Sequence, residues 1–204
     1  MPDHFITDLA ALEALYGPVA APSTAKEADH LHPAYARWVA QARFALLATS
    51  GEHGPDVSPR GDAGPLVRIV DEHTLLLPER RGNNRIDSLR NVLADPRVSL
   101  IFLIPGVGEA VRVRGRAAIS VDPELLASFA VDGKAPHCVL RITVDKVFFQ
   151  CARAILRSRL WHPEEHGREG VPTAGQILAA LTDNAIDGAA YDCSLPQRQR
   201  DTLY

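Results

Sequence analysis

The chain is poor in lysine, cysteine and methionine, and it has no long apolar run. Its 204 residues include three lysines, three cysteines and one methionine. No stretch approaches the roughly 20 apolar residues of a membrane span, and the N-terminus lacks the basic segment and apolar run of a signal peptide. The widely spaced Cys138, Cys151 and Cys193 contain no CxxC pair, so they fit neither a disulfide framework nor a zinc site. We therefore expect a soluble, cytoplasmic protein in a reducing compartment.

A large net charge is also missing. The chain has 25 acidic and 22 basic residues, a net charge of −3, so no general attraction to nucleic acid or anionic membrane is expected. Of the 22 basic residues 19 are arginine, whose planar fork of donors suits phosphate and carboxylate. A GC-rich genome would also favour arginine over lysine. Ten arginines and seven acidic residues lie between Arg60 and Arg116, so an anion site is expected in that segment.

Several motifs of known chemistry are absent. The sequence contains no HExxH, no GxSxG, no GxGxxG and no GxxxxGK[ST]. It therefore gives no support for metal-assisted hydrolysis, a nucleophile elbow, a dinucleotide-binding fold or a P-loop. We expect no metal site, and no catalytic residue can be named. A bound cofactor that performs the chemistry would reconcile an anion site with the missing acid–base groups.

What is present is a series of short apolar β segments separated by turns. The periodicity predicts strands over 44–49, 55–60, 66–70, 74–77, 98–104, 110–121 and 139–149. Helices are predicted over 5–16, 32–42, 84–93, 123–129, 152–160 and 173–181, with a linker at 18–25. About six or seven strands at this spacing favour a mainly β, α+β fold: a small antiparallel barrel with peripheral helices.

One candidate binding motif leaves a predicted strand at Asp56-Val-Ser-Pro-Arg-Gly-Asp62. Ser58 and Arg60 are two residues apart, so they point to the same side of an extended strand. A hydroxyl beside a guanidinium suits a phosphorylated or polyhydroxylated ligand. The alternative is an exposed loop in which Arg60 pairs with Asp56 or Asp62.

A stronger phosphate signal lies in Leu77-Pro-Glu-Arg-Arg-Gly-Asn-Asn-Arg85, a strand end that runs through a Gly-Asn turn into a predicted helix. Unpaired N–H groups at a helix N-terminus attract anions, and three arginines within six residues reinforce the attraction. The alternative is that Asn83 or Asn84 is a simple N-cap and the arginines are solvated.

Two further segments are rich in arginine. Arg112, Arg114 and Arg116 share one face of a strand, which an anion, a partner chain or solvent would cover. The segment 148–161 joins basic residues to Trp161, which could stack on a flat ring. Cys151 in this segment is expected to be packed and inert rather than a reactive thiol.

Taken in order, these motifs resemble those of the FMN-binding split-barrel superfamily, the pyridoxamine 5′-phosphate oxidase-related proteins, over roughly residues 35–165. The resemblance implies a six-stranded antiparallel split β-barrel that forms a homodimer, with two FMN molecules at the subunit interface. It implies that Ser58 and Arg60 contact the flavin or its ribityl chain. The residues implied at the phosphate end are Arg81, Asn83, Asn84 and Arg85. The late segment, with Arg157, Ser158 and Trp161, is implied to approach the flavin from the same or the other subunit, although Gln150 and Arg153 stand where His and Lys are expected.

This resemblance divides the chain into an N-terminal helical extension (1–30), an FMN-binding split-barrel domain (31–165) and a C-terminal helical tail (166–204). The tail departs from that of true pyridoxamine phosphate oxidases. Their R-L-H-D-R run and final R-L-x-P motif are replaced by Arg159-Leu-Trp-His162 and by an end at Gln199–Tyr204. Oxidation of vitamin B6 is therefore not the reaction that we predict first.

The function predicted from these observations is that of an FMN-dependent oxidoreductase acting on a small molecule. One alternative is a non-catalytic module that binds flavin or haem. Another is an oligomeric barrel with no small-molecule site. The sequence does not distinguish FMN from the deazaflavin used by sister branches, nor does it identify the substrate or the electron donor.

Overall fold

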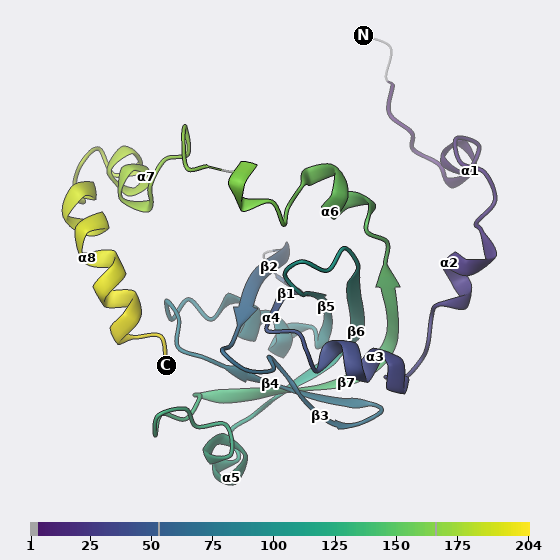
Figure 1. Cartoon of the computed structure of the whole chain (residues 1–204), viewed down its shortest axis with the longest axis horizontal. Helices are drawn as coiled ribbons and strands as arrows, with labels where there is room; N and C mark the ends of the chain where they lie inside the picture. The colour runs from purple at the N-terminus through teal and green to yellow at the C-terminus, as the bar shows by residue number, and fades with distance from the viewer. Residues whose placement is uncertain (1–3, 53, 166) are drawn as a thin grey trace.

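A single seven-stranded antiparallel sheet forms the centre of the computed structural model, which describes residues 4–52, 54–165 and 167–204 (Figure 1). The strands are β1 (Phe44–Gly51), β2 (Gly54–Gly61), β3 (Arg68–Asp71), β4 (Thr74–Glu79), β5 (Arg97–Leu103), β6 (Ala110–Ser120) and β7 (Cys138–Gln150). Their order across the sheet is β2-β1-β5-β6-β7-β4-β3. The predicted mainly β, antiparallel architecture is confirmed. The sheet has seven strands rather than the six of the implied barrel, because the four-residue β3 pairs with β4 as a separate hairpin.

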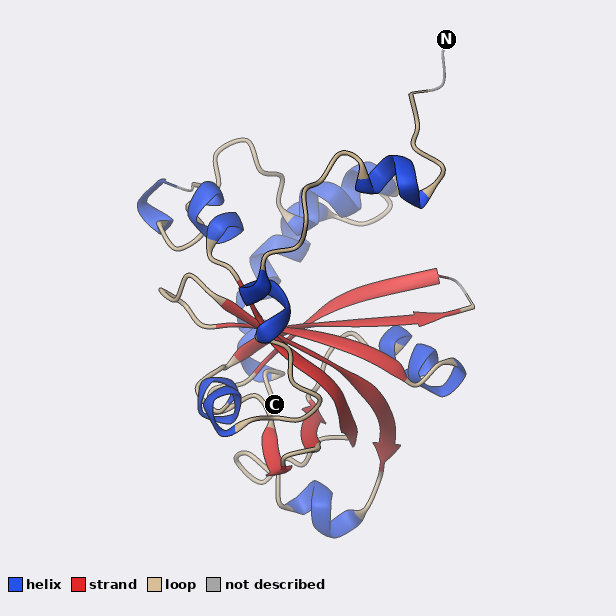
Figure 2. Ribbon diagram, turned by 90° about the vertical axis from the view of Figure 1, so that its right-hand side faces the viewer, coloured by secondary structure: helices blue, strands red, loops and turns tan. Residues whose placement is uncertain are grey.

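The sheet is strongly twisted (Figure 2), and the burial of side chains along β1, β5 and β6 shows that one of its faces is covered. Burial alternates along β1, β5 and β6, as expected when successive side chains point to opposite faces. In β4 every residue from Thr74 to Pro78 is buried, so this strand is covered on both faces. The largest fully buried side chains, which form the core, are Phe102, Leu47, Leu66, Leu75, Leu77, Leu100, Leu140 and Ile142.

Helices lie around the sheet. They are α1 (Leu9–Glu13), α2 (Ala21–Ala25), α3 (Pro33–Val39), α4 (Asp87–Ala94), α5 (Pro123–Ala127), α6 (Arg153–Ser158), α7 (Ala174–Leu181) and α8 (Gly188–Asp201), with a 3₁₀ turn at Pro163–Glu165. The helix that matters most for the site is α4, which packs against β1, β2 and β6 and buries Ser88 and Val92. No helix within the described part of the chain is long and apolar enough to cross a membrane.

The N-terminal segment differs from its prediction. The helix expected over 5–16 shortens to α1, which buries none of its residues, and Phe5 is 83% exposed. The expected linker at 18–25 contains the short helix α2, because Pro22 is tolerated in the first turn of a helix. The chain then reaches the sheet, where Ala28 exchanges backbone hydrogen bonds of 2.8 and 2.9 Å with Val147.

The C-terminal segment forms a helical hairpin of α7 and α8, beside the sheet in Figure 1. The two helices approach closely at Gly175 and Gly188: a Cβ on Gly175 would lie 2.1 Å from the carbonyl oxygen of Gly188. Asp192 accepts hydrogen bonds from the hydroxyl of Thr173 and from the backbone N–H of Gly175. Helix α8 was not predicted, since Pro196 lies inside it and its apolar residues follow no helical period.

Gly115 offers a test of the packing of β6 against β7. It sits at the register shift between these strands, where an added Cβ would lie 2.2 Å from the carbonyl oxygen of Thr143. We expect Gly115→Ala to lower the free energy of unfolding by about 1 to 3 kcal/mol, the usual cost of overpacking, as measured by urea denaturation. Gly64→Ala is the matched control, because a Cβ there meets open space. Equal stabilities of the two variants would contradict the described register.

Candidate functional site

A cavity of about 620 Å³ opens where β2, β4 and the start of α4 meet. Its volume lies in the range typical of small-molecule and cofactor sites. The described residues that line it include Asp56, Ser58, Arg60, Glu79, Arg80, Arg81, Asn83, Arg85, Ser88 and Leu203. Five of the nine residues predicted as cofactor contacts are therefore brought together in one cavity: Ser58, Arg60, Arg81, Asn83 and Arg85.

A chain of hydrogen bonds crosses one wall of this cavity. The Nη1 of Arg60 donates to the Oγ of Ser58 at 2.8 Å, and Ser88 donates to the carboxylate of Asp56 at 3.2 Å. The two serine oxygens are 2.8 Å apart. Because the single hydroxyl proton of Ser88 goes to Asp56, Ser58 is the donor to Ser88. All four side chains are thus held in place before any ligand arrives.

Two ion pairs join the end of β2 to the end of β4. Arg60 and Glu79 lie on the two strands, and Asp62 and Arg80 are the residues that directly follow them. The Nε of Arg60 lies 3.1 Å from Glu79, and the Nη2 of Arg80 lies 2.8 Å from Asp62. The side chains are mostly buried, with exposures of 14% and 21% in the first pair and 16% and 8% in the second. The alternative in which Arg60 pairs with Asp56 or Asp62 is wrong: its acidic partner is Glu79, which lies on a strand distant in sequence.

In the loop between β4 and α4, some residues of the predicted phosphate block already have hydrogen-bond partners and one does not. The Nε of Arg85 donates to Asp87 at 2.8 Å, and this hydrogen bond raises the pKa of Arg85. The amide oxygen of Asn83 accepts from the backbone N–H of Arg85 at 3.1 Å. Arg81 has no hydrogen-bond or ion-pair partner among the residues that the structure describes. It is therefore the arginine of this block that is available to an anion.

The helix α4 begins at an unusual N-cap. Ile86 has φ of 52°, and two residues earlier Asn84 has φ of 59°. Asn tolerates this left-handed conformation, whereas a β-branched residue rarely adopts it. Ile86 makes no side-chain cap, so the alternative in which Asn83 or Asn84 caps the helix is wrong. The conformation turns the loop so that Asn83 and Ile86 line the cavity, while Asn84 lines a neighbouring one.

The three candidates on and after α6 lie outside the cavity. Arg157, Ser158 and Trp161 are not among the described residues that line it. The hydroxyl of Ser158 donates to the carbonyl oxygen of Ile155 within its own helix at 3.1 Å. The indole N–H of Trp161 donates to the carbonyl oxygen of Val107 at 2.7 Å, which ties α6 to the turn between β5 and β6.

Several residues of the cavity were not predicted from the sequence. Ser88 and Glu79 complete its polar wall, and Leu203 reaches it from the distant C-terminal segment. Glu79 stood beside the predicted arginines, but nothing in the spacing singled it out. A serine in the first turn of a predicted helix was the one available signal for Ser88, and no signal pointed to Leu203.

The burial of the cysteines differs from what the sequence predicted. Cys151 is exposed, so the prediction that it is packed is wrong. Cys138 is the buried cysteine, and burial raises the pKa of its thiol, with a further contribution from the charge of Glu79. Cys138 pairs with Glu79 in the ladder between β4 and β7, so the two side chains lie beside each other on the same face of the sheet.

The arginine stripe on β6 lies on the other, half-exposed face of the sheet. The guanidinium groups of Arg112 and Arg114 lie 5.2 and 5.6 Å from the ring centre of Phe148. Arg112 also lines a hollow of about 320 Å³ with Leu46, Val57 and Ile101. Within one chain this face remains open.

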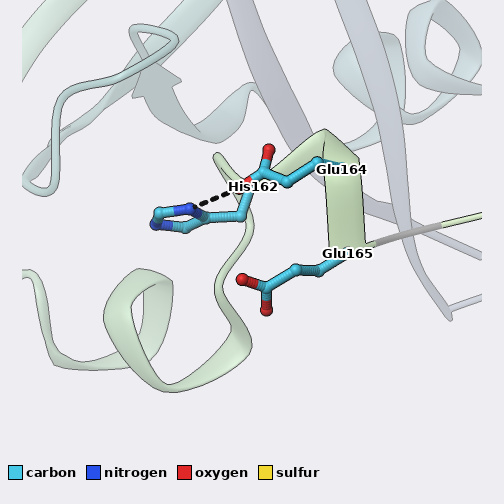
Figure 3. Close-up of side chains that lie close together, drawn as sticks. All are labelled: His162, Glu164 and Glu165. Atoms are coloured by element: carbon cyan, nitrogen blue, oxygen red, sulfur yellow. Dashed lines mark hydrogen bonds and ion pairs between the residues drawn. The ribbon is translucent and has the colours of Figure 1, made fainter.

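A separate cluster follows α6 in the sequence: His162, Glu164 and Glu165 (Figure 3). One ligand atom from each lies within 4.8 Å of the others, which is geometrically compatible with a metal ion. Ion pairs account for the arrangement, since the Nδ1 of His162 lies 3.0 Å from Glu164 and Arg159 pairs with Glu165. All three residues are exposed, and such groups are common without an ion, so we assign no metal here.

The fold and the cavity together define a class of protein: a twisted antiparallel split-barrel sheet with an arginine-rich cavity lined by β2, β4 and the start of α4. The particular family is given by sequence. The profile of the pyridoxamine 5′-phosphate oxidase family matches residues 31–151, and the chain belongs to that family. No curated protein matches the chain.

Several solved structures are similar to part of this chain at low sequence identity. A HupZ variant from Group A Streptococcus is 18% identical, with a TM-score of 0.49, and the match covers 59% of this chain and 99% of that one. An FAD-binding protein from Mesorhizobium loti is 23% identical, with a TM-score of 0.39 and coverage of 59% and 94%. An FMN-binding protein from Syntrophomonas wolfei is 13% identical, with a TM-score of 0.40 and coverage of 56% and 78%.

The pair between Asp62 and Arg80 provides a stability test of the site. We expect Asp62→Asn to lower the free energy of unfolding by about 1.5 to 3 kcal/mol, because it leaves a mostly buried guanidinium without its carboxylate. Denaturant titration measures the change. Glu27→Gln is the control, since its ion pair with Lys146 lies in solvent and its loss should change little. Equal effects of the two substitutions would show that the Asp62 pair does not hold the two strand ends together.

Proposed function

We propose that this protein binds FMN in the cavity between β2, β4 and α4 and catalyses a redox reaction on a small molecule. The observation that carries the proposal is the coincidence of a preformed polar wall with an unpaired Arg81, in one cavity of a chain of this family. A site organised before binding loses less conformational entropy when its ligand arrives.

The residues of the cavity fit the two chemical ends of FMN. Arg81 and the loop at Asn83 offer a positive charge and amide groups to a phosphate. The hydroxyls of Ser58 and Ser88, both in the hydrogen-bonded wall, offer polar contacts to a ribityl chain or to a flavin ring edge. Arg60 is held by Glu79, so its role is to fix Ser58 as well as to contribute charge.

When bound, FMN would supply the ability to accept and return a hydride or single electrons. The chain's own residues would bind the cofactor, orient it and exclude water from one side of it. This division of labour fits a cavity whose carboxylates are engaged: Asp56 accepts from Ser88, and Glu79 pairs with Arg60.

The proposal includes a homodimer. The open face of β1, β2 and β5 carries Val57, which is 60% exposed, beside the partly exposed Leu46 and Ile101. Association through this face would bury apolar surface that solvent covers in one chain. It would also allow a partner subunit to bring its own α6 segment, with Arg157, Ser158 and Trp161, toward the flavin.

Flavin binding is tested by titrating the purified full-length protein with FMN and following the absorbance and fluorescence of the flavin. We expect a complex with wild-type protein and an affinity about 10- to 100-fold lower for Arg81→Ala, because a charged hydrogen bond is lost. Arg85→Ala should have a smaller effect, since Arg85 is already paired with Asp87. Arg37→Ala, which removes an exposed arginine of α3, is the matched control. A protein that binds no FMN under these conditions contradicts the proposal.

Turnover separates an enzyme from a binding module. Flavin-loaded protein that NAD(P)H, reduced deazaflavin or ascorbate reduces, and that a second substrate reoxidises, supports catalysis. A loaded protein that none of these donors reduces supports the alternative of a non-catalytic flavin-binding module.

The dimer has its own test. Val57→Asp places a charge on the open face of β2 without touching the core, so we expect the variant to remain folded but to dissociate. Sedimentation velocity at several protein concentrations measures the mass. Val70→Asp, on β3 at the opposite edge of the sheet, is the control. A monomeric wild-type protein, or a Val57→Asp dimer as tight as wild type, contradicts association through this face.

A further inference from the structure

Three histidines come together where the N-terminal part of the chain joins the sheet. His30 and His32 lie in the segment before α3, and His73 lies in the turn between β3 and β4. The ring centre of His30 is 6.3 Å from that of His32 and 6.1 Å from that of His73. The ring planes are inclined by 53° and 63°, so neither contact is a parallel stack. His30 is therefore the centre of a group of imidazoles drawn from two separate segments.

Backbone hydrogen bonds fix these two segments beside each other. The residue between the first two histidines, Leu31, is 2% exposed, and its N–H donates to the carbonyl oxygen of Glu72 at 2.7 Å. In the facing turn, the backbone N–H of His73 donates to the carboxylate of Asp71 at 2.8 Å. The histidine backbones are thus held in place, and only their side chains have to move to reach a common ligand.

Carboxylates already accompany two of the rings. The Nδ1 of His30 lies 2.8 Å from the carboxylate of Asp29, and the Nε2 of His73 lies 3.7 Å from that of Glu72. A carboxylate only accepts hydrogen bonds, so the Nδ1 of His30 carries the proton and its Nε2 keeps a free lone pair. Histidines that ligate metals commonly donate their other ring nitrogen to a carboxylate, which orients the ring and makes it more basic.

The third ring, that of His32, has its lone pair at Nδ1. This atom accepts from the backbone N–H of Ala34 at 3.2 Å and so caps α3. The hydrogen bond is at the long end of the usual range, and the residue is exposed. A rotation of the side chain therefore exchanges this cap for a different partner.

The rings stand close to the separation that one metal ion requires. With metal–nitrogen bonds of about 2.0 to 2.1 Å, imidazoles on one tetrahedral ion have ring centres about 5 Å apart. The observed separations have to shorten by about 1 Å to reach this value. Side chains that are 35% and 52% exposed, as in His30 and His73, are free to make that adjustment.

This group differs in chemistry from the cluster around His162. That cluster offers one imidazole, and Arg159 already pairs with one of its two carboxylates. Here there are three imidazoles, and the described ion pairs of the rings are with the carboxylates of Asp29 and Glu72 alone. Imidazole is a preferred ligand of zinc, copper and nickel ions.

We infer that His30, His32 and His73 bind one divalent transition-metal ion of the class that prefers imidazole ligands. Zn²⁺ and Cu²⁺ are its natural probes. The ion ties the segment before α3 to the turn between β3 and β4, and water completes its coordination. None of the three histidines is among the described residues that line the cavity proposed for FMN. The metal site is therefore independent of the proposed function.

The test uses full-length protein without an affinity tag, stripped of metal with a chelator and titrated with ZnCl₂ by isothermal titration calorimetry. We expect one ion per chain. The variants His30→Gln and His73→Gln should bind Zn²⁺ at least 100-fold more weakly. Asp29→Asn keeps all three imidazoles and should bind about 10- to 100-fold more weakly, the usual effect of losing a carboxylate that orients a ligating histidine.

Two further variants separate metal ligation from other effects. His32→Asn removes an imidazole but keeps a side chain that caps helices well, so weaker Zn²⁺ binding in this variant reports a lost ligand rather than a damaged α3. His162→Gln removes the only histidine of the other cluster and should bind like wild type.

Electron paramagnetic resonance of the Cu²⁺ complex identifies the ligand atoms without reference to affinity. We expect nitrogen hyperfine structure in wild-type protein and its loss in His30→Gln. The inference is overturned if wild-type protein shows no saturable Zn²⁺ binding, or if the Cu²⁺ spectrum shows oxygen ligands alone. It is also overturned if any variant of the three histidines binds like wild type, or if binding is lost in His162→Gln instead.

Discussion

The site depends on two ion pairs that connect distant parts of one sheet. β2 stands at one edge of the strand order and β4 next to the other edge, yet Arg60 reaches Glu79, and Arg80 reaches Asp62. These contacts join the two strand ends beside the cavity that Arg60, Glu79 and Arg80 line. Because the four side chains are mostly buried, the pairs are shielded from salt and their geometry is restrained.

These two ion pairs separate the arginines of the cavity into those with a carboxylate partner and one without. Arg60 and Arg80 are neutralised by carboxylates and act as parts of the wall. Arg81 is left without a partner among the described residues, and with Lys134 it gives the neighbouring cavity an uncompensated positive charge. A molecule with a net charge of −3 can therefore present a local cationic site. Such a local site lacks the extended basic surface that nucleic acid needs.

Much of the fold was predictable because it is encoded in local patterns. Alternating apolar residues predicted β1, β5, β6 and β7 close to their observed bounds, and the turn residues between them predicted antiparallel pairing. Proline was a poor guide near the ends of the chain: Pro22 lies in the helix α2, and Pro196 lies within α8. These helices were missed because neither has the apolar period on which a helix prediction rests. The division into an extension, a barrel domain and a tail stays a prediction.

Prediction of the site was limited by its dependence on long-range contacts. The block from Arg81 to Arg85 was found because its residues are adjacent in sequence, and Ser58 with Arg60 because they are two apart on a strand. The partner of Arg60 was predicted wrongly, since Glu79 is brought beside it only when the sheet twists.

By itself, the sequence determined the mainly β antiparallel fold, the family and the segments that carry arginine, because these follow from local periodicity and from residues close together in the chain. Only the tertiary structure decided which arginines are neutralised, that Ser88 completes the hydrogen-bonded wall, and that Lys134, His137 and Tyr204 gather around a second cavity. The physical reason is that charge pairing and cavity shape depend on distances between residues up to 142 positions apart, such as Asp62 and Tyr204, and no local pattern encodes those distances.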